Sequence, residues 1–283
     1  KNGQKMSKRL GNAIDPFKTL NDYGPDATRW YMISNSNPWD NLKFDIDGVD
    51  EGKRKFLGTL YNTYSFFALY ANIDGFVFKE SEIAHKNRPE IDRWILSELN
   101  SLIEKVDNLY SDYEPTKVAR AISEFIIEYL SNWYVRLSRR RFWKGEYELD
   151  KISAYQTLYT VLLNVSKLSA PIAPFFMDKL YQDLTKNVLI NNVESVHLDL
   201  FPKVNASLID KKLEEKIKYA QKISSLTLSL RAKEKIKVRQ PLNKIMIPVN
   251  SNEQKKQISS VSELIKREVN VKEIEFIEEH SDL

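Results

Sequence analysis

Cysteine is absent from this 283-residue sequence, and glycine is scarce. Without cysteine the chain can form neither a disulfide nor a thiolate zinc site, which fits a reducing compartment. Glycine supplies 8 residues, well below its usual share of about 7% of a chain, and none follows Gly145. Because glycine breaks regular structure, its scarcity together with long periodic stretches predicts long helices.

Long apolar runs and a strong charge imbalance are also missing. No stretch approaches the ~20 apolar residues that span a bilayer, and no signal peptide is visible, so we expect a cytoplasmic protein without membrane contact. The net charge is +4, with 29% charged residues, which excludes a protein that is basic throughout and makes any nucleic-acid footprint local. His85 has no partner at metal-ligand spacing and is expected to be exposed; we predict no metal site. The start at Lys1 predicts a piece of a longer protein.

A cationic stretch lies close to the start of the chain, between Gly3 and Gly11, and consists of Lys5, Met6, Ser7, Lys8 and Arg9. Two lysines three residues apart in a segment flanked by glycine suit a polyphosphate. A frayed basic terminus is the simpler alternative. Asp15 can cap a helix that has Pro16 at its first position, so the stretch is expected to lead into a positioned helix.

Apolar residues recur at helical spacing over most of the chain, which predicts a mainly α-helical fold. Near the start we expect short helices from Pro16 and Pro25, a short strand over 42–45 and an aromatic-rich helix over 49–71. Helices from Pro89, Pro115, Asp150 and Pro174 predict an up-and-down bundle, closed by an extended segment over 195–202. Beyond it, a helix over 213–230, strands over 244–249 and 271–277, and a helix over 261–268 predict a small α/β unit.

The densest cationic patch ends the helix predicted from Pro115. Arg136, Arg139 and Arg140 share a helical face, and arginine forks bind phosphates, with Trp133 nearby as a stacking surface. The helix dipole also favours arginine near a helix C-terminus. Four acidic residues could pair with these arginines instead: Glu124, Glu128, Glu146 and Glu148. Phosphate binding and internal pairing both stay open at this point.

The run from Gly3 to Pro16 resembles the KMSKS signature of class Ia aminoacyl-tRNA synthetases, in the form of the isoleucyl branch. The segments 24–31, 56–67, 131–143 and 170–175 are similar to that branch and follow in the same order. The resemblance implies a mainly α fold, in which a class Ia anticodon-binding helical bundle follows the KMSKS loop and a connecting segment and precedes a small α/β subdomain. The implied domains are 1–48, 49–204 and 205–283.

The resemblance also implies a function: the C-terminal, tRNA-binding part of a ligase that activates isoleucine with ATP and Mg²⁺ and transfers it to tRNA(Ile). Lys5 and Lys8 would be catalytic, within an ATP-binding loop formed by Lys5, Met6, Ser7, Lys8 and Arg9, where Arg9 replaces the motif's final serine. The implied tRNA-binding candidates are Arg136, Arg139, Arg140 and Trp133. We expect a monomer that holds no cofactor and is inactive alone. The alternatives are a valyl or other branched-chain synthetase and a helical scaffold that binds protein.

Overall fold

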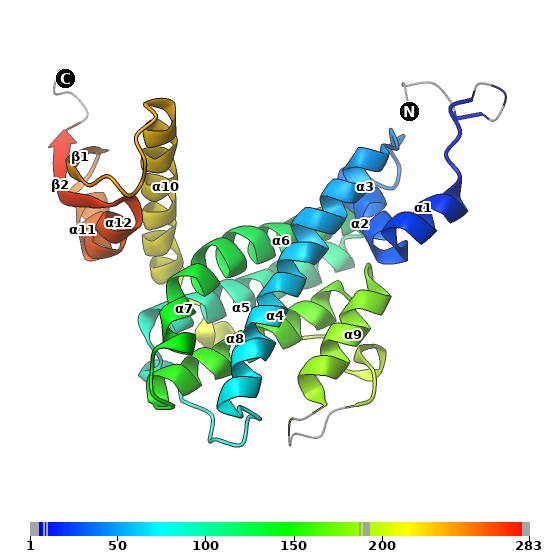
Figure 1. Ribbon diagram of the computed structural model, residues 1–283, viewed down its shortest axis with the longest axis horizontal. Helices are drawn as coiled ribbons and strands as arrows, with labels where there is room; N and C mark the ends of the chain where they lie inside the picture. Colours follow the sequence, from blue (N-terminus) through cyan, green and yellow to red (C-terminus); the bar gives the residue numbers. More distant parts are fainter. Residues whose placement is uncertain (1–5, 8, 10, 187, 189–192, 279–283) are drawn as a thin grey trace. The chain divides into compact units, whose positions relative to one another are not determined.

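The computed structural model of the protein describes residues 6, 7, 9, 11–186, 188 and 193–278 (Figure 1). Proline residues and a capping side chain start its first helices. Asp15 accepts hydrogen bonds from the backbone N–H groups of Phe17 (2.9 Å) and Lys18 (3.2 Å) at the start of α1 (Pro16–Tyr23). α2 (Pro25–Asn35) begins with a proline, whose fixed φ suits the first helical position. The helix starts predicted at Pro16 and Pro25 are confirmed.

The chain forms two compact units, Lys1–Ile209 and Asp210–Leu283. The first contains helices and no strand among its described residues, and the second contains the two strands of the described chain. The predicted mainly α fold class is therefore confirmed. The domain boundaries predicted after residues 48 and 204 stay predictions.

The strand predicted over 42–45 is wrong. This segment has no partner strand among the described residues, because a side chain binds its backbone instead. The Tyr31 hydroxyl donates to the carbonyl oxygen of Lys43 (3.2 Å) and accepts from the N–H of Asp45 (3.0 Å). Backbone polar groups that are satisfied in this way do not need a strand ladder.

The aromatic-rich helix is longer than predicted and contains one wider turn. α3 (Ile46–Gly52) continues through the π-helical segment η2 (Lys53–Leu57) into α4 (Gly58–Asp74). The Phe56 ring stacks on Trp30 with 3.7 Å between centroids, and Leu60 and Phe67 are buried. Tyr61, by contrast, is 56% exposed. One face of this helix is thus buried, whereas another face is open to solvent.

Further helical segments, described below, complete the bundle of the first unit. α5 and α6 are antiparallel neighbours, and α8 packs on both α5 and α9 (Figure 1). None of the helices in the described chain is both long and apolar enough to cross a membrane. The segments are α5 (Glu90–Ser111), α6 (Pro115–Glu124) continuing through the π-helical η4 (Phe125–Val135) into α7 (Arg136–Trp143), α8 (Leu149–Ser169) and α9 (Pro174–Thr185).

The segments on either side of α5 differ in exposure. Tyr113, which follows α5, is 84% exposed. The reason is that α5 ends at Ser111 and Tyr113 has a φ of +58°. His85, expected to be exposed, is half-buried in the short 3₁₀ turn η3 (His85–Asn87).

The extended segment predicted over 195–202 contains a 3₁₀ turn, η5 (Val196–Leu198). The Ser195 hydroxyl donates to an Asp178 carboxylate oxygen at 2.7 Å, and the same oxygen accepts from the N–H of Val196 at 2.9 Å. The segment is therefore fastened to helix α9 by a side chain, and it lacks the ladder partner that a strand needs. A third short turn, η6 (Ala206–Leu208), precedes the end of the unit.

The second unit is a helix–strand–helix–strand arrangement, as predicted. β1 (Leu242–Val249) and β2 (Val271–Glu278) pair in parallel, with Leu242 opposite Val271. Parallel strands need a crossover connection, which α11 (Asn252–Ser260) and α12 (Ser262–Val269) supply. α10 (Lys211–Lys233) packs on both of these helices. Leu213, Ile217 and Ala220 of α10 are buried, whereas Leu226 and Leu230 are more than half exposed.

A fully buried carboxylate joins its own helix to three other helical segments of the first unit. Asp92 of α5 accepts hydrogen bonds from the Tyr134 hydroxyl of η4 (2.9 Å) and the Ser153 hydroxyl of α8 (2.6 Å). Arg141 of α7 donates to both of its oxygens, at 2.6 and 2.8 Å. A bidentate, charge-assisted pair of this kind is among the strongest polar contacts in proteins. It fixes the rotation of α7 against α5.

A second arginine extends this buried network to the loop before α5. Arg88, 5% exposed, donates to the Thr157 hydroxyl (2.8 Å) and the Ile83 carbonyl oxygen (3.0 Å). Burial lowers the pKa of Arg88, while the charges of Asp92 and Glu82 oppose that shift. Burial also disfavours charge on Arg141, but its interactions with Asp92, Tyr134 and Asp150 together outweigh burial and raise the pKa of Arg141. Burial and the Asp92 charge raise the pKa of Tyr134 well above its usual value, so Tyr134 remains a donor.

Replacing the buried carboxylate tests how much this network contributes to the free energy of unfolding. Asp92→Asn removes the charge that compensates the Arg141 guanidinium, which is 15% exposed. We expect the free energy of unfolding of the first unit to fall by about 3 kcal/mol, as for other broken buried pairs. Urea unfolding followed by tryptophan fluorescence measures it, since all five tryptophans lie within residues 1–209.

Asp150→Asn is the matched control for that variant. Asp150 binds the same guanidinium at 3.0 Å, but its side chain is 59% exposed. Water screens such a pair, so we expect a loss below about 1 kcal/mol. Equal losses in the two variants would contradict the role of Asp92.

Candidate nucleic-acid interface

Two hydrogen bonds lie in the cationic loop, the stretch formed by Lys5, Met6, Ser7, Lys8 and Arg9. The N–H of Ser7 donates to the Asn12 side-chain oxygen (2.7 Å), and the N–H of Arg9 donates to the Ser7 hydroxyl (3.2 Å). Met6 and Arg9 are exposed. Lys5 and Lys8, the predicted catalytic residues, lie outside the described residues. The described part of the loop is therefore a turn that presents Arg9 to solvent.

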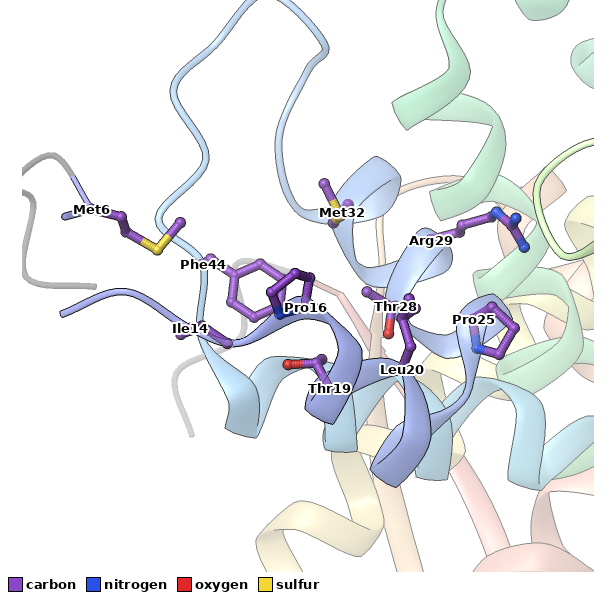
Figure 2. Close-up of a pocket in the computed structure, with 10 residues that line it drawn as sticks. All are labelled: Met6, Ile14, Pro16, Thr19, Leu20, Pro25, Thr28, Arg29, Met32 and Phe44. Carbon is purple, nitrogen blue, oxygen red and sulfur yellow. The ribbon is translucent and has the colours of Figure 1, made fainter. Parts of the chain in front are cut away.

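An apolar pocket of about 400 Å³ opens beside this turn (Figure 2). Figure 2 shows Met6 and Ile14 on one side of it and Pro25 and Arg29 on the other. Its lining is mostly apolar, which makes it a poor fit for a triphosphate. The lining residues are Met6, Ile14, Pro16, Thr19, Leu20, Pro25, Thr28, Arg29, Met32 and Phe44.

α6 holds the segment that carries the loop. The Arg120 guanidinium donates to the carbonyl oxygens of Ser34 (2.8 Å) and Asn35 (3.1 Å), the last residues of α2. These carbonyls lack partners within their own helix, so Arg120 acts as a C-terminal cap from another helix. The Trp30 indole N–H also donates to the Ser123 hydroxyl of α6 at 3.1 Å.

α9 contacts the same segment at its N-terminus. Asp26, in the first turn of α2, accepts a hydrogen bond from the backbone N–H of Phe176 at 2.6 Å. This N–H is one of the unpaired donors in the first turn of α9, and a carboxylate there is favoured by the helix dipole. The break at Pro171 and Pro174 thus places α9 so that its first turn meets α2.

The predicted arginine face lies on the surface of α7. Arg136, Arg139 and Arg140 are all exposed. In the described chain, neither Arg139 nor Arg140 forms an ion pair with an acidic side chain. The Arg136 guanidinium donates to the Asn132 carbonyl oxygen (2.7 Å) and lies 5.5 Å from the centre of the Trp133 ring. Two guanidinium groups are therefore available for anions on one helical face.

The aromatic residues near this face differ in exposure. Trp133 is 5% exposed, which leaves little ring surface for a base to stack on, and Tyr134 is fully buried. Trp143, at the end of α7, is 59% exposed. An exposed stacking surface therefore lies at the C-terminal end of the arginine face, one helical turn from Arg139 and Arg140.

Sequence reasoning did not separate Arg141 from its neighbours. Arg141 turns inward to Asp92, whereas Arg139 and Arg140 turn outward. The spacing contained a signal, because Arg141 is seven residues after the buried Tyr134 and so lies on the same side of the helix. No group of three or more His, Asp or Glu side chains in the described part of the chain could hold a metal ion.

Comparison with known proteins matches two family models to this chain. The model for the anticodon-binding domain of tRNA ligase matches residues 92–247. The model for class I tRNA synthetases (I, L, M and V) matches residues 1–45. The first match includes α7 and its arginines, and the second includes the cationic loop and α2.

Curated relatives and a solved structure agree with these matches. Isoleucine–tRNA ligase of Cytophaga hutchinsonii is 61% identical over 99% of this chain and 25% of its own length. Isoleucine–tRNA ligase of Bacteroides thetaiotaomicron is 62% identical over 98% of this chain and 24% of its own length. The chain spans about a quarter of the length of these relatives. A ternary complex of Agrobacterium radiobacter K84 agnB2 LeuRS with tRNA and LeuAMS contains a similar fold, with a TM-score of 0.53 at 17% identity, covering 94% of this chain and 28% of that one.

The family model covers more than half of the chain, and the helical bundle that it matches carries the exposed arginine face. The chain belongs to the family of anticodon-binding domains of tRNA ligases, within the class I synthetases.

Proposed function

We propose that this chain is the C-terminal, tRNA-binding part of an isoleucine–tRNA ligase, which activates isoleucine with ATP and transfers it to tRNA(Ile). The observation that carries the proposal is the exposed arginine face of α7, within a chain that is 61% identical to such a ligase over nearly its whole length. The proposed specificity of the ligase for isoleucine is supported only by the similarity to isoleucine–tRNA ligases. The proposed enzyme is a cytoplasmic monomer.

The cationic loop would bind ATP in the complete enzyme. Lys5 and Lys8 would neutralise the charge that grows on the leaving pyrophosphate, an electrostatic role without proton transfer. The exposed Arg9 and the hydrogen bond from the Ser7 N–H to the Asn12 side chain support a loop that presents cations to phosphates. Mg²⁺ would bind through the phosphates, since it prefers phosphate and water oxygens. ATP would lie against the loop and outside the apolar pocket.

The arginine face would bind the tRNA backbone. Arg139 and Arg140 present guanidinium forks, which match phosphate geometry. Arg136 would be the third contact, steadied by the face of Trp133. We assign Trp133 a role through Arg136 and not a direct stacking role, because its ring is buried.

Lys8→Ala tests the catalytic role in the complete ligase that contains this sequence. Losing one preorganised charge-stabilising group should slow adenylate formation by roughly 10²–10³. Isoleucine binding should barely change, because the lysine acts on phosphates. ATP–pyrophosphate exchange measures the rate. Lys18→Ala, an exposed lysine of α1, is the control that should leave exchange unchanged; normal exchange in Lys8→Ala would end the assignment.

The 283-residue chain alone should make no isoleucyl-adenylate. In-line attack requires the two reactants to be held together, and the class I synthetase match covers only residues 1–45 here. Incubating the purified chain with ATP, isoleucine and labelled pyrophosphate tests this, with a complete ligase as the positive control. Activation by the chain alone would place the active site within these residues.

Arg139→Gln/Arg140→Gln tests the arginine face in the 283-residue chain. Losing two phosphate contacts should weaken tRNA(Ile) binding and reduce the slope of log K against log[salt] by about 1.4 to 1.8. The melting temperature should stay the same, because both side chains are exposed and Gln suits a helix.

Arg54→Gln/Lys55→Gln is the matched control for that double variant. These two cations are also exposed, but each already pairs with an acid four residues earlier, Asp50 and Glu51. The same charge is removed, and the salt slope should hardly move. A wild-type slope in the Arg139/Arg140 variant would sink the tRNA-contact assignment and favour a protein-binding scaffold.

A further inference from the structure

The last turn of α10 and the loop that leads from it to β1 in the second unit, together called the junction loop here, consist of residues 231–241 (Figure 1). It contains five cations and a single acid, Glu234, which gives it a formal charge of +4. The whole chain also has a net charge of +4, so all other residues together sum to zero. The excess positive charge of the protein therefore equals the charge of eleven consecutive residues. Those cations are Arg231, Lys233, Lys235, Lys237 and Arg239.

A buried arginine organises the junction loop. Arg231 is 3% exposed, and one of its terminal nitrogens donates to the carbonyl oxygens of Lys237 (2.9 Å), Val238 (3.1 Å) and Gln240. No carboxylate among the described residues pairs with it. Carbonyl dipoles satisfy hydrogen bonds but do not cancel a full charge, so the guanidinium adds to the positive potential of the loop.

Backbone hydrogen bonds hold the junction loop in one shape. The N–H of Ile236 donates to the Arg231 carbonyl oxygen at 2.8 Å. The N–H of Gln240 donates to the Lys237 carbonyl oxygen at 2.9 Å. The Asn270 side chain, next to β2, donates to the Val238 carbonyl oxygen at 2.8 Å. Cations on a fixed loop lose less entropy on binding than cations on a free one.

The four outer cations of the loop have no acidic partner among the residues that the structure describes. Lys233, Lys235, Lys237 and Arg239 are all exposed. On the neighbouring β1, by contrast, Lys244 forms an ion pair with Glu275 of β2. The second unit thus neutralises a cation on its sheet and leaves the four outer cations of the junction loop without such a partner. A dense group of exposed cations suits a polyanion.

We propose that the junction loop is a second phosphate-binding site for tRNA, separate from the arginine face of α7. The proposal rests on the tRNA-binding function proposed above. The anticodon-binding family match extends to residue 247 and therefore includes the loop. An acidic protein is a poorer fit, because protein interfaces need buried apolar anchors and the loop offers little exposed apolar surface beyond Val238, which is 46% exposed.

Lys237→Gln/Arg239→Gln in the 283-residue chain tests the site, with a tRNA(Ile) transcript as the probe. Binding is measured over a series of KCl concentrations. Two lost phosphate contacts should lower the slope of log K against log[salt] by about 1.4 to 1.8 and weaken binding by roughly 20- to 60-fold at 0.1 M salt. Arg231 and Lys235 are left in place, because one organises the loop and the other has a φ of +56°.

Lys218→Gln/Lys222→Gln on α10 is the matched control. Both lysines are exposed and belong to the same unit, so the control removes the same charge outside the loop. Its salt slope should stay near the wild-type value. If the two double variants lower the salt slope equally, net charge alone explains the binding. That result would contradict the proposed site. Circular dichroism should be the same for both variants, since all four side chains lie on the surface.

Other outcomes separate this proposal from the function on which it rests. If the wild-type chain does not bind the transcript, the proposed function fails. If the wild type binds and Arg139→Gln/Arg140→Gln weakens binding while Lys237→Gln/Arg239→Gln does not, only the junction-loop site fails. Unchanged tRNA binding with a lost affinity for a polyglutamate peptide would assign the loop to an acidic protein and would also overturn it.

Discussion

The buried carboxylate of Asp92 is the contact on which the bundle depends most. Its two oxygens receive four hydrogen bonds, from a tyrosine, a serine and both terminal nitrogens of an arginine. A buried charge is tolerated only when it is paired and hydrogen-bonded, so the helices that supply these donors must keep their relative rotation. The outward direction of Arg139 and Arg140 follows from the inward direction of Arg141.

The segment that carries the cationic loop is tied to the bundle by equally specific contacts. Arg120 of α6 caps the end of α2, and Asp26 at the start of α2 meets the first turn of α9. Both ends of one short helix are thus satisfied by other helices of the bundle. This arrangement ties α2, which follows the cationic loop and α1, to the helices of the first unit at both of its ends.

Sequence periodicity predicted most of the helices, since apolar stripes and prolines act locally. It failed where a distant side chain took the place of a local pattern. Tyr31 binds the backbone of residues 42–45, and Asp178 binds residues 195–196. Neither contact can be predicted from the alternation of apolar and polar residues in those segments. The arginine face was predictable from spacing, but the burial of Trp133 was not, because an aromatic residue suits a core and a ligand surface equally well. The loop lysines Lys5 and Lys8 lie outside the described residues.

The π-helical course of η4, from Phe125 to Val135, changes how this region tolerates insertions and deletions. A π-helical turn contains more residues than an α-helical turn. If residues 125–135 were α-helical instead, the side chains of α7 would therefore be rotated about the helix axis. Each residue of an α-helix turns the next by about 100°, and Arg140 and Arg141 are one residue apart. The number of residues between Glu124 and Arg136 therefore decides which arginine meets Asp92, and a change of chain length there would exchange a structural arginine for a surface one without altering either side chain.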